Sequence, residues 1–196
     1  MPSAVLDSPT QEKLPERFRF TRENYEAMIA AGILDENEGL ELIDGEIVKK
    51  MSINPSHAAT VKRLNRLFSQ RVGDACVVSV QDPIALDGFN EPEPDIALLK
   101  SRADLYGESH PGPSDVYLIV EVADSSLRFD RERKIPLYAA AGIPEVWLID
   151  LIGRCLIRHR QPVAGMYREV TRHFEGESVP VPPQGKISIA LKDLGL

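Results

Sequence analysis

The spacing of apolar residues predicts three amphipathic helices in this chain. In these stretches the apolar positions recur every three or four residues, which is the period of a helix with one buried face. Pro136 falls inside the last helix and must either kink it or mark its first turn, because proline lacks an N–H and clashes with the preceding turn. The predicted helices cover Arg22–Ala31, Pro55 to about Val72, and Arg128–Ala141.

Short apolar runs bounded by Gly, Pro, Asp or Asn predict strands around these helices. The pair Asp44-Gly45 favours a type I′ turn, so the flanking segments Leu40–Ile43 and Glu46–Met51 should form an N-terminal β-hairpin. The mixture of strands and helices indicates the α/β (α+β) class. The other predicted strands are Cys76–Val80, Ile84–Leu86, Ile96–Leu99, Val116–Ala123, Val146–Ile149, Arg154–Arg160, Tyr167–Phe174 and Ile187–Leu191, with an antiparallel pairing expected at the C-terminal end.

Length and composition indicate one globular domain. The chain has 196 residues, of which 43% are hydrophobic and 27% charged. We expect a disordered lead-in over residues 1–17, which has neither apolar periodicity nor the apolar core of a secretory signal, and a single domain over residues 18–196. No apolar run approaches the roughly 20 residues of a membrane span. We therefore expect a soluble, cytoplasmic protein that does not bind membranes.

The net charge of −7 argues against a protein that coats nucleic acid without specificity. Six acids and no Lys or Arg lie between Asp35 and Glu46, and these acids account for all but one unit of the net charge. A local basic face is therefore compatible with the composition. Candidate phosphate contacts are Lys62, Arg63 and Arg66 on the second helix and Arg131 on the third, with an ordinary solvated face as the alternative.

The first candidate functional residue is Glu121, an acid inside an apolar run that suits a buried strand. An ionised carboxylate there needs a metal ion or a neighbouring cation as a partner. Asp95 opens another predicted strand 26 residues earlier, so two adjacent strands could bring the carboxylates together. Mg²⁺ binds such oxygen ligands, and Lys134 on the third helix would add a point charge.

Two further residues have alternative interpretations. Glu41 lies on the first strand of the hairpin, either as a solvent-exposed acid or as support for a metal site. His57 shares the apolar stripe of the second helix, either as a core or capping histidine or as a residue that reaches a central active site. On the third helix, Asp130, Lys134 and Tyr138 are spaced by four residues and should share one face.

Several segments, taken in order, resemble the Uma-two family of bacterial putative restriction endonucleases, within the PD-(D/E)XK nuclease superfamily. The resemblance runs from about Phe18 to the C-terminus, and YAAAGIPEVWLID is its most family-specific part. It implies a restriction-endonuclease-like core, in which a central mixed β-sheet is flanked by helices and the site lies where strands diverge. The segments are ELIDGEI (41–47), His57, PDIAL (94–98), VEVADSS (120–126), Asp130 with Lys134, and LYAAAGIPEVWLID (137–150).

The resemblance also implies roles for individual residues. Asp95 and Glu121 would bind Mg²⁺, with the backbone carbonyl of Val122 as a third ligand. The lysine that the superfamily places two residues after the second acid is replaced here by Ala123. Lys134 fits a relocation of that lysine to the following helix, since its side chain is long and flexible. Tyr138, His57 and Glu41 would then flank the site.

These observations favour a Mg²⁺-dependent endonuclease that hydrolyses DNA, with Mn²⁺ as a substitute ion and a homodimer as the expected assembly. Ala123 leaves a second interpretation open, a catalytically silent nuclease-fold module that binds DNA or a protein partner. A third is hydrolysis of RNA or of branched or single-stranded DNA. The sequence does not reveal any base specificity, because base readout depends on surface loops.

Overall fold

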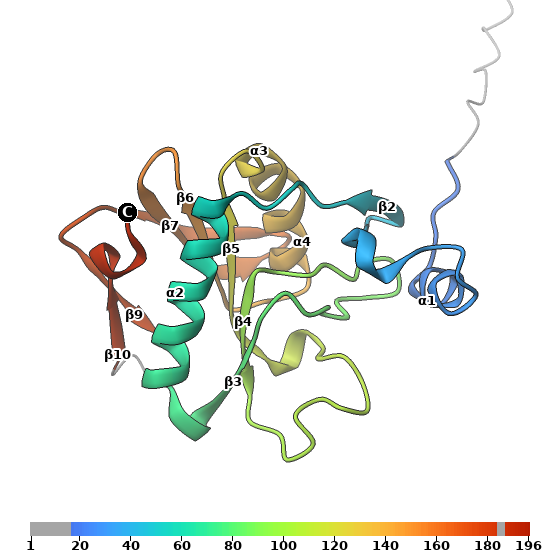
Figure 1. The fold of residues 1–196 in the computed structure, drawn as a ribbon, viewed down its shortest axis with the longest axis horizontal. Coiled ribbons are helices and arrows are strands. Elements are labelled where there is room, and N and C mark those ends of the chain that lie inside the picture. The colour runs from blue at the N-terminus through green and yellow to red at the C-terminus, as the bar shows by residue number, and fades with distance from the viewer. Residues whose placement is uncertain (1–16, 184–186) are drawn as a thin grey trace, which may run out of the picture.

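A six-stranded sheet forms the centre of the protein, in the strand order β3-β4-β5-β6-β7-β8 (Figure 1). The computed structural model describes residues 17–183 and 187–196, so the lead-in expected over residues 1–17 lies outside the described residues except for Arg17. The strands of the sheet are β3 (Cys76–Ser79), β4 (Ile96–Lys100), β5 (Val116–Ala123), β6 (Glu145–Asp150), β7 (Cys155–Val163) and β8 (Met166–His173).

The sheet is mixed, as the sequence predicted. Strands β5 and β6 are parallel, and every other neighbouring pair in the sheet is antiparallel. A parallel pair needs a crossover connection, and here a helical segment supplies it. This segment consists of α3 (Leu127–Phe129), a π-helical turn (Asp130–Lys134) and α4 (Ile135–Ala140).

The π-helical turn explains how Pro136 fits into the crossover helix. The N–H of Ile135 donates to the carbonyl of Asp130, five residues earlier. In a regular α-helix the ring of Pro136 would clash with the carbonyl of Glu132, four residues before it. The wider turn relieves that clash, so the predicted helix is continuous but locally widened, and such turns occur frequently at functional sites.

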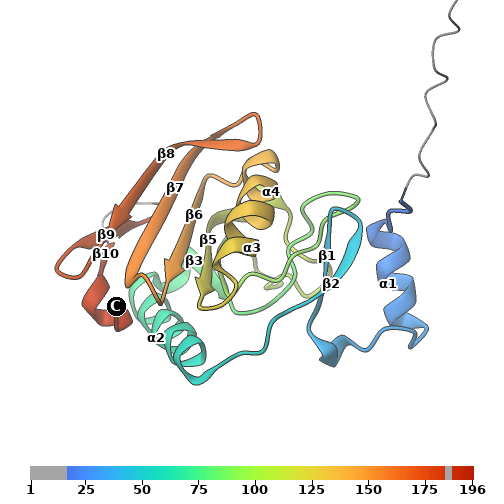
Figure 2. The ribbon, with the colours of Figure 1, turned by 90° about the horizontal axis from the view of Figure 1, so that it is seen from above.

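Helices cover both faces of the sheet (Figure 2). Helix α2 (Pro55–Arg71) packs one face, where Leu64 and Phe68 belong to the same buried cluster as Trp147 of β6. The crossover helix packs the other face, where Tyr138 and Ala139 join Ile119 of β5. Each helical layer therefore buries one side of β5 and of β6, whose residues are almost all buried.

Two smaller sheets and helix α1 lie outside the central sheet. The N-terminal part contributes α1 (Arg22–Ala30) and the hairpin of β1 (Leu40–Ile43) and β2 (Glu46–Lys49). Asp44 and Gly45 have φ values of 53° and 72°, as a type I′ turn requires, so the predicted hairpin is confirmed. At the C-terminal end, β9 (Ser178–Val181) pairs antiparallel with β10 (Ile187–Ala190).

One predicted strand is wrong. Ile84–Leu86 forms no strand, although Ile84 and Leu86 donate hydrogen bonds to the carbonyls of Pro92 and Asn90 in one neighbouring segment. Pro92 has no N–H to return the bond to Ile84, so no regular ladder forms. Among the described residues, no helix combines the length and apolarity needed to cross a bilayer.

Candidate active site

The pairing of β4 with β5 places Asp95 beside Glu121. Ile96, the first residue of β4, pairs with Val120 of β5. Asp95 and Glu121 occupy the next opposed positions in this antiparallel register, just beyond the end of the ladder. Side chains at directly opposed positions leave the same face of a sheet, with Cβ atoms about 5 Å apart. The strand pattern that the sequence predicted is therefore what brings the two carboxylates together.

Asp95 is fixed by hydrogen bonds from three directions. Its Oδ2 lies 3.0 Å from Nε2 of His57 and accepts a 2.9 Å hydrogen bond from the N–H of Val122. Its Oδ1 accepts a 3.2 Å bond from the side-chain amide of Gln81. The ring of His57 reaches Asp95 because Asn54 caps helix α2 by accepting from the N–H of His57. Of the two interpretations of His57, the structure favours the one that reaches the site.

Glu121 is fixed by the crossover helix. Its Oε1 accepts a 2.5 Å hydrogen bond from the hydroxyl of Tyr138 and lies 3.2 Å from the ammonium of Lys134. The same ammonium donates a 2.8 Å hydrogen bond to Oε1 of Glu41. This oxygen also accepts a hydrogen bond from the backbone N–H of Glu93. Glu41 is only 2% exposed, so the interpretation of this residue as a solvent-exposed hairpin acid is wrong.

Burial and mutual attraction perturb the ionisation of these groups. Burial raises the pKa of Glu121 to about 8, although Lys134 opposes the shift. Burial alone would lower the pKa of Lys134, but Glu121 and Glu41 outweigh it and the pKa is raised, so this side chain stays an ammonium ion. The hydrogen bond to Asp95 raises the pKa of His57. Burial would raise the pKa of Asp95, but the hydrogen bond and charge of His57 hold it below its ordinary value.

The packing around Ala123 accounts for the position of the lysine. Ala123 lies two residues after Glu121 on β5, so both side chains leave the same face of the sheet. That face is covered by the crossover helix, and Ala123 is fully buried in one cluster with Ile135, Tyr138 and Ala139. A long side chain at position 123 has no room beneath the helix. Lys134 of that same helix supplies the ammonium beside Glu121 instead.

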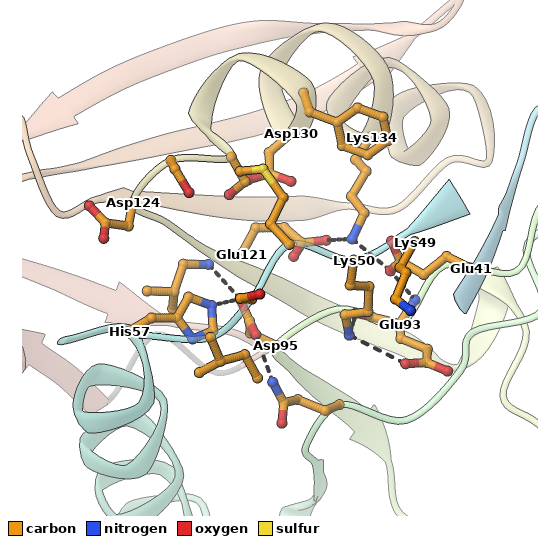
Figure 3. Close-up of a pocket in the computed structure, with 18 of the residues that line it drawn as sticks. Glu41, Lys49, Lys50, His57, Glu93, Asp95, Glu121, Asp124, Asp130 and Lys134 are labelled. Atoms are coloured by element: carbon orange, nitrogen blue, oxygen red, sulfur yellow. Dashed lines mark hydrogen bonds and ion pairs between the residues drawn. The ribbon is translucent and has the colours of Figure 1, made fainter. Parts of the chain in front are cut away.

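The carboxylates line a pocket of about 180 Å³. Figure 3 shows His57 beside Asp95, Lys134 directed from the helix towards Glu121, and Asp124 and Asp130 on the same side of the pocket as that helix. The link between β2 and α2, residues 50–54, lines another wall. Of the residues that the sequence singled out, the following line this pocket: Glu41, His57, Asp95, Glu121, Val122, Asp130 and Lys134.

The predicted phosphate contacts lie elsewhere. Lys62, Arg63, Arg66 and Arg131 are exposed, and none of them lines the pocket. Arg63 donates a 3.2 Å hydrogen bond to the carbonyl of Leu194, so it holds the C-terminal turn against α2. The helix face that carries the first three residues is therefore partly occupied by the protein's own C-terminal segment.

Other pocket residues were not predicted from the sequence. Gln81 holds Asp95 from a left-handed backbone conformation, with φ of 57°, and no pattern in the sequence marks it. Asn54 bonds to Asp124, and Lys50 lies 3.3 Å from Glu93. Asp124 lies in VEVADSS and Glu93 two residues before Asp95, so their proximity to the predicted acids was the available signal.

The residues available to a metal ion are few. Within residues 17–183 and 187–196, no group of three or more His, Cys, Asp or Glu side chains is arranged to hold an ion. The strand register places the carboxylates of Asp95 and Glu121 side by side, and backbone carbonyls lie next to them in the chain. Such a set matches Mg²⁺, which usually takes one or two carboxylates and completes its octahedron with water and substrate phosphate. The hard oxygen donors of this pocket fit that ion.

Comparisons with known proteins agree with this fold. The family model Uma2, described as "Putative restriction endonuclease", matches residues 22–192. A solved structure described as "a putative nuclease belonging to DUF820 from Anabaena variabilis ATCC 29413" is similar, with a TM-score of 0.68 and 17% sequence identity over 84% of this chain and 94% of that chain. At this identity the likeness shows a shared fold. No curated protein matches the chain.

Proposed function

The chain belongs to the Uma2 family, and on that premise we propose that it is a Mg²⁺-dependent endonuclease that hydrolyses phosphodiester bonds of DNA. The observation that carries the proposal is the pair of buried carboxylates, Asp95 and Glu121, with the ammonium of Lys134 3.2 Å from Glu121. Neither the family nor a nuclease fold specifies the ion or the substrate, so both are part of the proposal.

Asp95 and Glu121 would hold the ion, with the carbonyl of Val122 as the third protein ligand. A bound Mg²⁺ supplies Lewis-acid chemistry, acidifying water and neutralising charge on phosphate. Lys134 offers a fixed positive charge for the phosphoryl oxygens as charge develops on them. Tyr138 and Glu41 hold Glu121 and Lys134 in place, and His57 with Gln81 orients Asp95.

The test combines metal binding with cleavage. Mg²⁺ or Mn²⁺ should bind in titration calorimetry, and either ion should support nicking or cutting of DNA. Asp95→Asn and Glu121→Gln, which keep the volume of each side chain, should abolish both signals. Glu175→Gln is the matched control, because Glu175 is exposed and lies outside the pocket, so its substitution should leave both signals unchanged. Cleavage that survives both carboxylate substitutions would show that the site is elsewhere.

A catalytically silent module is the second candidate. The observation that favours it is that the ammonium of Lys134 is already engaged by two carboxylates, at 2.8 Å from Glu41 and 3.2 Å from Glu121. In that case nucleic acid or protein would bind without being cleaved. Binding of DNA in the presence of Mg²⁺, without any cleavage in either Mg²⁺ or Mn²⁺, would select this candidate over the enzyme.

A further inference from the structure

The lining of the pocket combines exposed apolar side chains with buried charged ones. Met51 and Ile53 line the pocket and are 48% and 53% exposed. Both lie on the link between β2 and α2, and Phe129 of α3 and Val48 of β2 add to the lining. Figures 1 and 2 show this link running from the hairpin to the first turn of α2. Apolar side chains exposed at a pocket offer a surface that an apolar part of the substrate can cover.

The lysines that line the pocket are all engaged in ion pairs. Lys49 lies 3.1 Å from Glu38, Lys50 lies 3.3 Å from Glu93, and Lys134 is held by Glu41 and Glu121. Proteins that bind along a DNA duplex do so mainly by neutralising successive phosphates with free Lys and Arg. Among the described lining residues, no lysine is therefore without a carboxylate partner that a duplex backbone would have to displace.

The depth of the carboxylates limits which phosphate can reach them. Asp95 and Glu121 are 6% and 3% exposed, at the floor of a pocket of about 180 Å³. A phosphate therefore has to reach into the pocket to contact them. Base pairing and stacking hold each phosphate on the outside of a duplex, whereas an unpaired nucleotide is free to turn its phosphate inwards. Its base then leaves the stack and presents an apolar face, which proteins commonly bind with aromatic and apolar side chains.

We propose that the pocket takes an unpaired nucleotide of DNA, with its phosphate towards Asp95 and Glu121 and its base against Met51 and Ile53. The inference rests on the proposed function and narrows its substrate to single strands and unpaired flaps or ends. Cutting one unpaired strand needs a single site, so the predicted homodimer is not required for this reaction.

Binding of labelled oligonucleotides tests the inference directly. A fluorescent single strand and a blunt duplex of the same sequence are titrated with the whole protein in Ca²⁺, followed by anisotropy, and then compared for cleavage in Mg²⁺. The single strand should bind and be cut at least about tenfold better than the duplex, since one bound base contributes about that factor or more to the affinity. A duplex with an unpaired flap should be cut at the flap.

The apolar contact is tested with the double variant Met51→Ser/Ile53→Ser. Its affinity for the single strand should fall about tenfold or more, because the apolar area that the base covers on both side chains is lost. Its melting temperature should stay unchanged, because both side chains are half exposed. Ile152→Ser is the matched control, because Ile152 is 74% exposed and lies outside the pocket. It should bind the single strand like the unaltered protein.

The outcomes separate this inference from the proposed hydrolysis. Equal binding and cutting of duplex and single strand, or full affinity in the double variant, would overturn the unpaired-nucleotide substrate and leave the nuclease assignment in place. A single-strand preference that depends on Met51 and Ile53, without cleavage in Mg²⁺ or Mn²⁺, would support the ligand class and overturn the proposed hydrolysis.

Discussion

The ammonium of Lys134 donates a 2.8 Å hydrogen bond to the carboxylate of Glu41, 93 residues earlier in the chain. Lys134 lies on the crossover helix, and Glu41 lies on the N-terminal hairpin, outside the central sheet. Both side chains are almost completely buried. Arg133 makes a second connection between these elements, at 3.3 Å from Asp44 and 3.1 Å from Glu46. The hairpin is therefore part of the site, since it holds the lysine that faces Glu121.

Glu41→Ala should destabilise the protein by about 3–5 kcal/mol, because it removes one partner of a buried ion pair and leaves the N–H of Glu93 without its acceptor. Urea denaturation measures this free energy of unfolding. Glu38→Ala is the control on the neighbouring turn. Its pair with Lys49 is exposed, so about 0–1 kcal/mol should be lost. Equal losses in the two variants would contradict a structural role for the buried pair.

The fold was predictable from the sequence because its strands are marked by apolar runs and its turns by Asp44-Gly45 and similar pairs. The same information placed Asp95 and Glu121 on adjacent strands. It left Glu41 and His57 ambiguous, since the burial of a side chain on a hairpin or a helix end depends on what packs against it. It did not reveal Gln81, whose role depends on a left-handed backbone conformation that Gln seldom adopts.

Ala123→Lys, introduced into a Lys134→Ala protein, should not restore cleavage. The side chain at position 123 points beneath the crossover helix into a cluster with Ile135 and Tyr138. A lysine there would overfill the core, which typically costs about 1–3 kcal/mol before the burial of its charge is added. Cleavage assays and urea denaturation of the double variant, beside Lys134→Ala alone, measure both effects. Recovery of activity without a loss of stability would show that the helix leaves room for a lysine at 123.

The affinity for Mg²⁺ should depend on pH through Glu121. Burial raises the pKa of this carboxyl to about 8, so below that pH it holds a proton that an incoming divalent ion must displace. The apparent affinity should therefore fall by up to about tenfold per pH unit below 8 and level off above it. Calorimetry in buffers of different ionisation heat measures both the affinity and the protons released.

The pKa of His57 is also raised, and its ring faces the other carboxylate, so the pH series needs a second background. In the His57→Asn protein, Glu121 titrates without the histidine, and the dependence of the Mg²⁺ affinity on pH near 8 should persist. In the Glu121→Gln protein, Mg²⁺ binding should be lost at every pH of the series. The same affinity at pH 6.5 and 8.5 in the His57→Asn protein would mean that Glu121 does not bind the ion.

Gln81 should lower the stability of the protein through its strained backbone while raising the affinity for Mg²⁺ through its hydrogen bond to Asp95. Its φ of 57° is a conformation that costs non-glycine residues about 1 kcal/mol or more, and its amide donates a 3.2 Å hydrogen bond to Oδ1 of Asp95. Gln81→Ala and Gln81→Gly both remove the amide, but only glycine adopts this backbone without strain. We expect Gln81→Gly to be about 1 kcal/mol more stable than Gln81→Ala in urea denaturation. Both variants should bind Mg²⁺ several-fold more weakly than the unaltered protein in calorimetry, because Asp95 loses the group that orients it. Equal stability of the two variants would argue against backbone strain at this position, and unchanged affinity in both would argue against Gln81 as a positioning residue.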